Sequence, residues 1–208
     1  IGQTVLIFLT WLSLIFISGI SLFLFFSFFT LILFFLSFLV LFIPKFEYIL
    51  IRISSFLNPS SGNNYQSEKA SEAIISGGFF GKGIGEGTLK NKVPEAHTDY
   101  IISVISEEFG VIAIILILLL FLIFIYSIFK KVYHENEEKT KLILVGCASL
   151  ILMQAMIHIG VNIRLFPTTG MTLPFISYGG SSIISISILS GIILNLTKRK
   201  INWYEKKL

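Results

Sequence analysis

The chain has 208 residues, of which 54% are hydrophobic and 13% are charged. Soluble domains carry about 25% charged residues, so this composition excludes a soluble globular domain and a disordered chain. It also excludes a nucleic-acid-binding protein despite the net charge of +4, because most of so apolar a surface must face lipid. The single cysteine, Cys147, lies in an apolar run. It excludes an internal disulfide framework and a cysteine-based zinc site.

The first 44 residues contain no charged side chain. As one helix they would extend roughly 65 Å, about twice the roughly 30 Å hydrocarbon core of a bilayer. A turn near Gly19 therefore predicts two helices, near residues 4–19 and 22–43. No basic segment or cleavage site precedes the first apolar run, so we expect no signal peptide. We interpret the chain as a fragment, or as a mature protein without its N-terminal part.

A polar segment, residues 45–100, comes next, and three apolar runs follow it, at residues 109–129, 142–163 and 181–197. With the first two helices, these runs predict an all-α polytopic membrane protein with about five transmembrane helices. Residues 165–180 are apolar but contain two prolines and three glycines. Non-helical backbone at membrane depth requires surrounding protein or water, so we expect a re-entrant loop that lines the functional site.

Basic residues give the orientation. The turn at 130–141 contains four lysines, and the tail at 198–208 contains five lysines or arginines. Basic segments stay on the cytoplasmic side, so both should be cytoplasmic. Residues 45–100 and 165–180 then lie outside.

A glycine-rich stretch at residues 76–90 lies in the first outer segment. Exposed N–H groups in such a loop can hold phosphate oxygens. There is no Gly-Lys-Ser/Thr step, which excludes a P-loop, and no strand precedes the loop, which excludes a dinucleotide-binding fingerprint. On glycine content alone, a flexible outer loop is the favoured alternative.

Asp99 lies where the outer segment turns into a span, and helical spacing places Ser103, Glu107 and Gly110 on the same face. An ionisable group at this depth indicates function. Alternatively, Asp99 complements the positive end of the helix dipole. The residues alone leave these two interpretations equal for Asp99, and favour the dipole for Glu107 and Glu108.

Two further polar features call for interpretation. His97 and Asp99 are too few ligands for a metal site. Gln154, His158 and Asn162 repeat at four-residue spacing in an apolar span, with Arg164 at its outer end. Lipid-facing amides are costly, so this stripe is expected to make interhelical hydrogen bonds rather than contact a substrate.

Several motifs resemble the SEDS family of membrane proteins. They include Arg52 through Asn58-Pro59, Tyr65-Gln66, Pro94-Glu95-Ala96-His97-Thr98-Asp99, the Glu-Glu-Phe-Gly step at residues 107–110, and the run from Pro167 to Ser182. Ala96 and the Thr172-Leu173-Pro174 step resemble the cell-division member more than the elongation member. The resemblance covers essentially all 208 residues. It implies the C-terminal half of a single membrane domain with about ten helices.

The resemblance implies an inverting peptidoglycan glycosyltransferase that polymerises lipid II in septal cell-wall synthesis and cell division. Asp99 occupies the position of the family's catalytic aspartate and would act as general base. The leaving diphosphate needs cations or N–H donors. The residues expected to contact substrate are Arg52, Gly81, Gly83, Gly85, Lys90, Glu95, His97, Thr98, Ser177 and Tyr178.

The resemblance also implies partners and a location. A class B penicillin-binding protein transpeptidase and other division proteins would be the partners, at the septum of the bacterial inner membrane. A divalent cation, Mg or Mn, could bridge the diphosphate, although no ligand cluster demands one. Three alternative functions stay open at this point: a lipid II flippase, an elongation-type glycosyltransferase, and a scaffold that recruits a transpeptidase.

Overall fold

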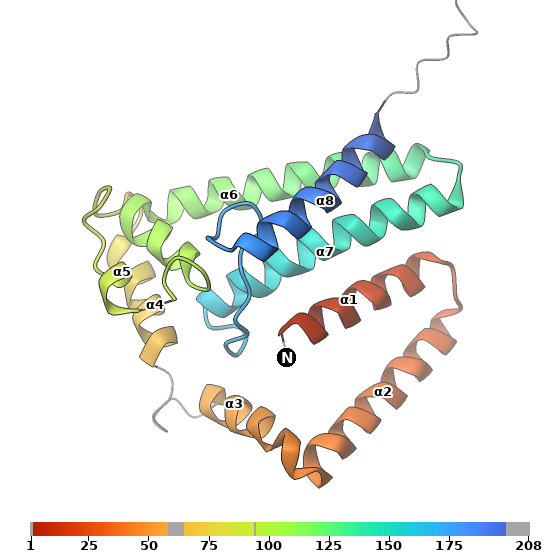
Figure 1. Ribbon diagram of the computed structural model, residues 1–208, viewed down its shortest axis with the longest axis horizontal. Coiled ribbons are helices and arrows are strands. Elements are labelled where there is room, and N and C mark those ends of the chain that lie inside the picture. Colours follow the sequence, from red (N-terminus) through yellow and green to blue (C-terminus); the bar gives the residue numbers. More distant parts are fainter. Residues whose placement is uncertain (1, 58–64, 94, 199–208) are drawn as a thin grey trace, which may run out of the picture.

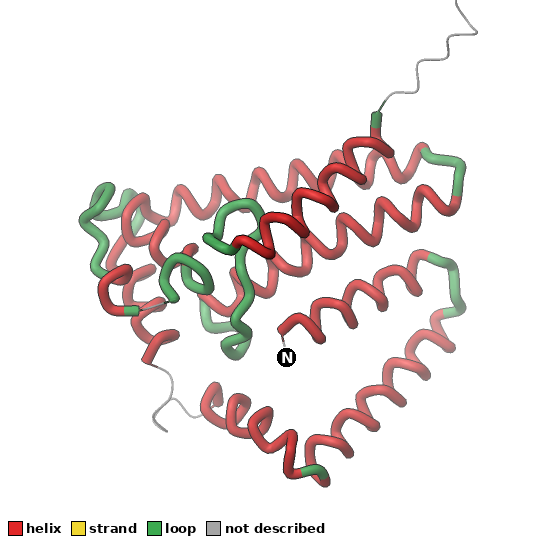
Figure 2. The backbone as a smooth tube through the Cα atoms, viewed as in Figure 1, coloured by secondary structure: helices red, strands yellow, loops and turns green. Residues whose placement is uncertain are grey.

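The computed structural model describes residues 2–57, 65–93 and 95–198, and within them it contains helices joined by loops and no strand (Figures 1 and 2). The all-α prediction is confirmed. Asn58, Pro59, Pro94 and the basic tail beyond Lys198 lie outside the described residues. The elements are α1 (Gly2–Ile17), α2 (Leu22–Phe42), the 3₁₀ helix η1 (Pro44–Phe46), α3 (Glu47–Leu57), α4 (Tyr65–Gly77), α5 (Leu89–Lys92), α6 (Ile101–His134), α7 (Glu138–Asn162) and α8 (Gly180–Thr197).

Helix α7 is the centre of the bundle, because it packs against α1, α4, α6 and α8. The main core lies between α6, α7 and α8 and includes the fully buried Ile102, Leu144 and Ile151. Cys147 is buried in this same cluster, as expected of a small packing residue. A second cluster joins α1 and α7 to the segment that leads into α6.

Four of the described helices are long and apolar enough to cross a membrane: α2, α6, α7 and α8. Helix α1 is apolar but has 16 residues, about 24 Å at 1.5 Å per residue. The five predicted apolar helices are therefore present, one of them shorter than a typical span. The segment between α2 and α6 departs from the expected long loop, because much of it is folded into α3, α4 and α5.

The connections between α6, α7 and α8 lie at the two ends of the bundle (Figure 1). The α6–α7 turn lies near the C-terminal end of α8, whereas α4, α5 and the loop between α7 and α8 lie at the opposite end. Helix α1 runs antiparallel to α7, with Gly2 against Met171 and Leu14 near Gly146. This arrangement agrees with the expected alternation of the spans. Which end faces the cytoplasm stays a prediction.

Helix α2 diverges from the bundle (Figure 1) and buries none of its residues. Phe23 and Phe34 are 81% and 77% exposed. A helix that is apolar on all sides suits a hydrocarbon environment or other apolar helices. The surface of α2 is therefore that of a membrane-embedded element.

Candidate functional site

Asp99 lies in a series of turns, residues 95–100, immediately before α6. Its backbone N–H donates to the carbonyl of Glu95 at 3.0 Å. From the neighbouring helix α7, Nδ2 of Asn162 donates to the Asp99 carbonyl at 3.0 Å. Tyr100, the next residue, is 2% exposed. The backbone of Asp99 is thus fixed from both sides, while its carboxylate is half-buried.

The Asp99 side chain lines a cavity of about 160 Å³ between α3, α4, α7 and the α7–α8 loop. Its carboxylate lies close to Gly170, where an added Cβ would be 3.6 Å from Oδ2. The cavity is lined by Arg52, Gln66, Asp99, Tyr100, Val161, Thr168, Thr169, Gly170 and Met171. Asp99 supplies the carboxylate of this cavity and Arg52 supplies the cation.

Burial raises the pKa of the Asp99 carboxyl, and the negative charge of Glu95 raises it further. Burial also raises the pKa of Tyr100 to about 12, with a smaller contribution from the charge of Asp99. A carboxylate with a raised pKa holds a proton more tightly, which makes it a better general base. A raised pKa suits proton transfer, which agrees with the functional interpretation of Asp99.

The polar stripe of α7 holds the α7–α8 loop and the Asp99 turn in place. His158 Nδ1 lies 2.7 Å from the carbonyl of Met171, and Gln154 Nε2 donates to the carbonyl of Thr172 at 2.9 Å. Asn162 Oδ1 accepts from the Ser103 hydroxyl at 2.8 Å. These hydrogen bonds give the stripe the structural role that the sequence favoured. Its partners are loop carbonyls as well as a neighbouring helix.

The α7–α8 loop is bonded directly to the turn that carries Asp99. Ser177 Oγ donates to the carbonyl of Thr98 at 2.7 Å and accepts from the N–H of Leu173 at 2.8 Å. The N–H of Tyr178 donates to the carbonyl of His97 at 3.1 Å. The expected substrate contact by Ser177 is corrected, because the residue is 3% exposed and its hydroxyl is bonded to backbone groups. The side chain of Tyr178 is 81% exposed and stays available.

The glycine-rich loop packs backbone to backbone against α6. The N–H of Gly81 donates to the carbonyl of Gly77 at 2.8 Å, and that of Gly83 donates to the carbonyl of Glu108 at 3.0 Å. An added Cβ at Gly81 would collide with the Glu108 backbone, and one at Gly110 with the Phe79 backbone. The expected phosphate contacts of Gly81 and Gly83 are corrected, because their N–H groups already have protein acceptors.

Glu107, a buried residue of α6, also binds the glycine-rich loop. Its carboxylate accepts from Lys82 Nζ at 3.0 Å, from the Thr88 hydroxyl at 3.1 Å and from the Leu89 N–H at 2.9 Å. Because α6 begins at Ile101, Glu107 is beyond the first turn. The dipole interpretation of this residue is therefore wrong.

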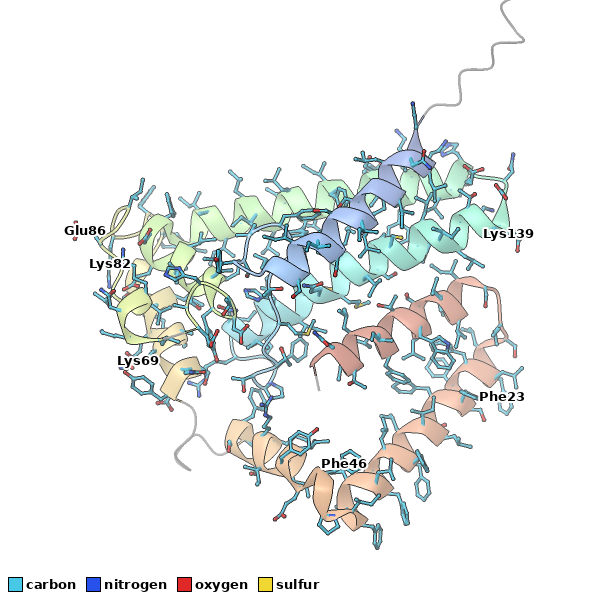
Figure 3. All side chains as sticks on the ribbon, in the orientation of Figure 1. Phe23, Phe46, Lys69, Lys82, Glu86 and Lys139 are labelled. Atoms are coloured by element: carbon cyan, nitrogen blue, oxygen red, sulfur yellow. The ribbon has the colours of Figure 1, made fainter. Side chains whose placement is uncertain are left out.

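Lys90 contacts the glycine-rich loop and does not line the Asp99 cavity. Its Nζ donates to the carbonyl of Gly85 at 2.9 Å and lies 3.4 Å from Glu108 Oε1. Figure 3 shows Lys82 and Glu86 at the same outer edge of the loop. Lys90 is not among the residues that line the cavity, which corrects the expected diphosphate contact.

Of the remaining expected residues, Gly85 lies in the glycine-rich loop, and Glu95, His97 and Thr98 belong to the Asp99 turn. Thr98 Oγ1 donates to Glu95 Oε2 at 2.7 Å, and His97 and Glu95 are exposed. Thr168 lines the cavity from the 165–180 loop, which was expected to line the site. Gln66 also lines the cavity but carried no predicted role, because no local pattern could place so distant a residue beside Asp99.

A divalent cation would find few protein ligands here. Within the described ranges, no three His, Cys, Asp or Glu side chains cluster to hold a metal ion. Mg²⁺ sites are often built from one or two carboxylates and substrate phosphates. Asp99 fits that limited role, so a bound cation would depend mainly on oxygens of the substrate.

Fold and site together define a polytopic membrane protein with a cavity, lined by one carboxylate and one guanidinium, at one end of its helix bundle. The profile of the FTSW_RODA_SPOVE family, described as a cell cycle protein, matches residues 1–202. The chain belongs to this family, which is the SEDS family.

Several relatives carry the name "Probable peptidoglycan glycosyltransferase FtsW". The protein of Borreliella burgdorferi is 41% identical over 160 residues, covering 74% of this chain and 44% of the relative. That of Caulobacter vibrioides is 38% identical over 74% of this chain and 40% of the relative. That of Coxiella burnetii is 37% identical over 94% of this chain and 54% of the relative. The chain thus spans about half the length of these relatives.

A solved structure confirms the fold. It matches with a TM-score of 0.72 and 23% identity, over 95% of this chain and 55% of that chain. It is described as "Structural coordination of polymerization and crosslinking by a peptidoglycan synthase complex". At this identity the match supports the helical architecture alone.

Proposed function

We propose that the protein is a peptidoglycan glycosyltransferase that polymerises lipid II during septal cell-wall synthesis and cell division. The observation that carries the proposal is the half-buried carboxylate of Asp99, which lines a cavity beside the Arg52 guanidinium. The names of the relatives support the same reaction class. Asp99 is the general base in this proposal.

In the proposed reaction, an acceptor sugar hydroxyl attacks the anomeric carbon of a sugar linked to a lipid diphosphate. Asp99 takes the hydroxyl proton as the new C–O bond forms, and the proton ends on its carboxyl group. The old C–O bond breaks, and its electron pair leaves with the diphosphate. Arg52 offsets the developing negative charge. One direct displacement inverts the anomeric configuration.

The test is Asp99→Asn in the complete encoded protein, purified in detergent and supplied with lipid II. Asn preserves size but cannot accept the proton, so we expect polymer formation to fall about 10²- to 10⁴-fold. Glu137→Gln, which neutralises an exposed carboxylate at the opposite end of the bundle, is the matched control. Wild-type rates for Asp99→Asn would reject the proposal. Polymer made in detergent, where no second leaflet exists, also excludes a flippase.

The proposed partner is a class B penicillin-binding protein transpeptidase of the division machinery, and the proposed location is the septum of the inner membrane. The description of the structural neighbour as a synthase that couples polymerisation and crosslinking supports this pairing. Co-purification with the cognate transpeptidase tests it. A Mg or Mn ion that bridges the diphosphate is part of the same proposal. Loss of polymer on chelation, restored by either ion, would support it.

A further inference from the structure

A second cavity, of about 220 Å³, adjoins the Asp99 cavity and contains two arginines. Arg52 and Arg164 both line it. The two cavities share Arg52, Val161 and Thr168 as lining residues, so the space beside the carboxylate continues into a space beside two guanidinium groups.

The backbone of Arg164 has an unusual conformation for this residue type. Helix α7 ends at Asn162 with Ile163 as its C-cap, and Arg164 follows with φ 59°. The N–H of Arg164 donates to Val161 at 3.1 Å, and that of Leu165 donates to Gly160 at 2.7 Å. This hydrogen-bond pair is a Schellman motif, whose left-handed position is usually glycine.

An arginine in that position accepts backbone strain that a glycine would avoid. Such strain persists when the surrounding structure enforces it, and it concentrates at functional sites. The Phe166 ring lies against Gly160, which fixes the chain on the far side of the turn. The turn therefore holds Arg164 at the wall of the cavity.

The charges of this cavity are unbalanced. None of its lining residues is acidic. The ion pairs found within the described ranges join Lys69 to Glu72, Lys82 to Glu107 and Lys90 to Glu108, and involve neither arginine. Arg52 donates from Nη1 to the carbonyl of Thr168 at 3.1 Å, which uses one of the five N–H donors of a guanidinium.

We propose that Arg164, together with Arg52, binds the diphosphate group of a lipid-linked sugar. Guanidinium groups present paired donors that match phosphate oxygens, and two of them balance the charge of a diphosphate. The adjoining carboxylate of Asp99 then lies on the side of the sugar that the acceptor attacks. This inference rests on the proposed function for the identity of the ligand. The anion site itself rests on the two arginines.

The test measures binding to the complete encoded protein in detergent, with inorganic pyrophosphate and farnesyl diphosphate as probes. Arg164→Gln should weaken binding of at least one probe tenfold or more, which is about 1.4 kcal/mol. Arg164→Lys, which retains the charge, should recover part of the loss. Lys139→Gln is the control, because Lys139 is an exposed cation at the opposite end (Figure 3).

Arg164→Gly separates the loss of the cation from misfolding, because it removes the guanidinium and also relieves the strained backbone. It should therefore lose binding while retaining the thermal stability of the wild type. Arg164-dependent binding of farnesyl diphosphate alone assigns the site to a lipid headgroup. Equal dependence for both probes assigns it to diphosphate in general.

Wild-type affinity of Arg164→Gln for both probes would overturn the inference, whatever the polymerisation assay shows. Conversely, a protein that makes no polymer but binds diphosphate through Arg164 would overturn the proposed function and leave the anion site intact.

Discussion

Asp99 shows how a single residue gains its chemistry from its position. The turn that holds it places the carboxylate half inside a cavity and near the charge of Glu95, and both effects raise its pKa. A base with a raised pKa is active above that pKa and protonated below it. The rate of a reaction that needs this base therefore falls as pH decreases through the raised pKa.

Glu95→Gln should shift this pH profile. Removing the charge of Glu95 removes the smaller of the two causes of the raised pKa, so the pKa of Asp99 should decrease. The acidic limb of the polymerisation rate should then move to lower pH, whereas Glu137→Gln should leave it unchanged. The measurement is the initial rate against pH at saturating lipid II. An acidic limb that stays in place or moves to higher pH would contradict the assignment of this limb to Asp99.

Asn162 holds the Asp99 turn in position and takes no part in the proposed reaction itself. Its amide joins the Asp99 carbonyl and the Ser103 hydroxyl across 63 and 59 residues of sequence. Asn162→Ala removes this partner from the buried Ser103 hydroxyl, at a cost of about 1–3 kcal/mol, and from the part-buried Asp99 carbonyl.

We therefore expect Asn162→Ala to lower both the unfolding temperature and the rate. Ser190→Ala is the control, because the Ser190 hydroxyl bonds only to the carbonyl of Ile186 within its own helix. Thermal unfolding in detergent measures the difference. Equal unfolding temperatures for the two variants would contradict the role of Asn162.

At the scale of elements, the glycine-rich loop and α6 form one unit. The loop follows α4 and lies against the point where Gly110, with φ 80° and ψ 177°, interrupts the helix. There the N–H of Val111 donates to the carbonyl of Gly78 at 2.9 Å. Glu107 adds an ion pair with Lys82 of the loop. The unit supports the N-terminal end of α6, next to the turn that carries Asp99.

Gly81 and Gly85 offer a matched pair for testing this unit. Both have positive φ, 78° and 84°, but an added Cβ collides with the α6 backbone at Gly81 and meets nothing within 4 Å at Gly85. Gly85→Ala should cost about 1–2 kcal/mol from backbone strain alone. Gly81→Ala should cost about 1–3 kcal/mol more. Chemical unfolding of the two variants gives the difference. Similar losses would mean that the loop is not packed against α6.

The sequence predicted the helices better than the site, for a physical reason. Uncharged runs mark helices in lipid because every backbone group must be bonded within the segment. The uncharged run at 109–129 covers only part of α6, because Glu107 is buried within that helix with hydrogen-bond partners of its own. Asp99 stood out as a carboxylate beside an apolar span. Its neighbour Gln66 did not, because it approaches Asp99 only in the folded chain.

At the scale of the whole molecule, the candidate site and the basic α6–α7 turn lie at opposite ends of the helix bundle. The Asp99 cavity, the two arginines and the glycine-rich loop occupy one end, and the α6–α7 turn with its lysines occupies the other (Figure 1). Basic turns are retained in the cytoplasm, so this separation predicts that the cavity opens outward. A lipid-linked substrate exported to the outer face would then reach Asp99 without crossing the bilayer again.

Single cysteines test this orientation. Glu86 and Lys139 are exposed and lie at opposite ends of the bundle (Figure 3), and Cys147 is buried, so Cys147→Ala gives a silent background. In cells with a permeabilised outer membrane, an impermeant thiol reagent should label Glu86→Cys. It should label Lys139→Cys only after the inner membrane is opened, because a charged reagent does not cross the hydrocarbon core. The reverse pattern would place Asp99 on the cytoplasmic side and contradict polymerisation at the outer face.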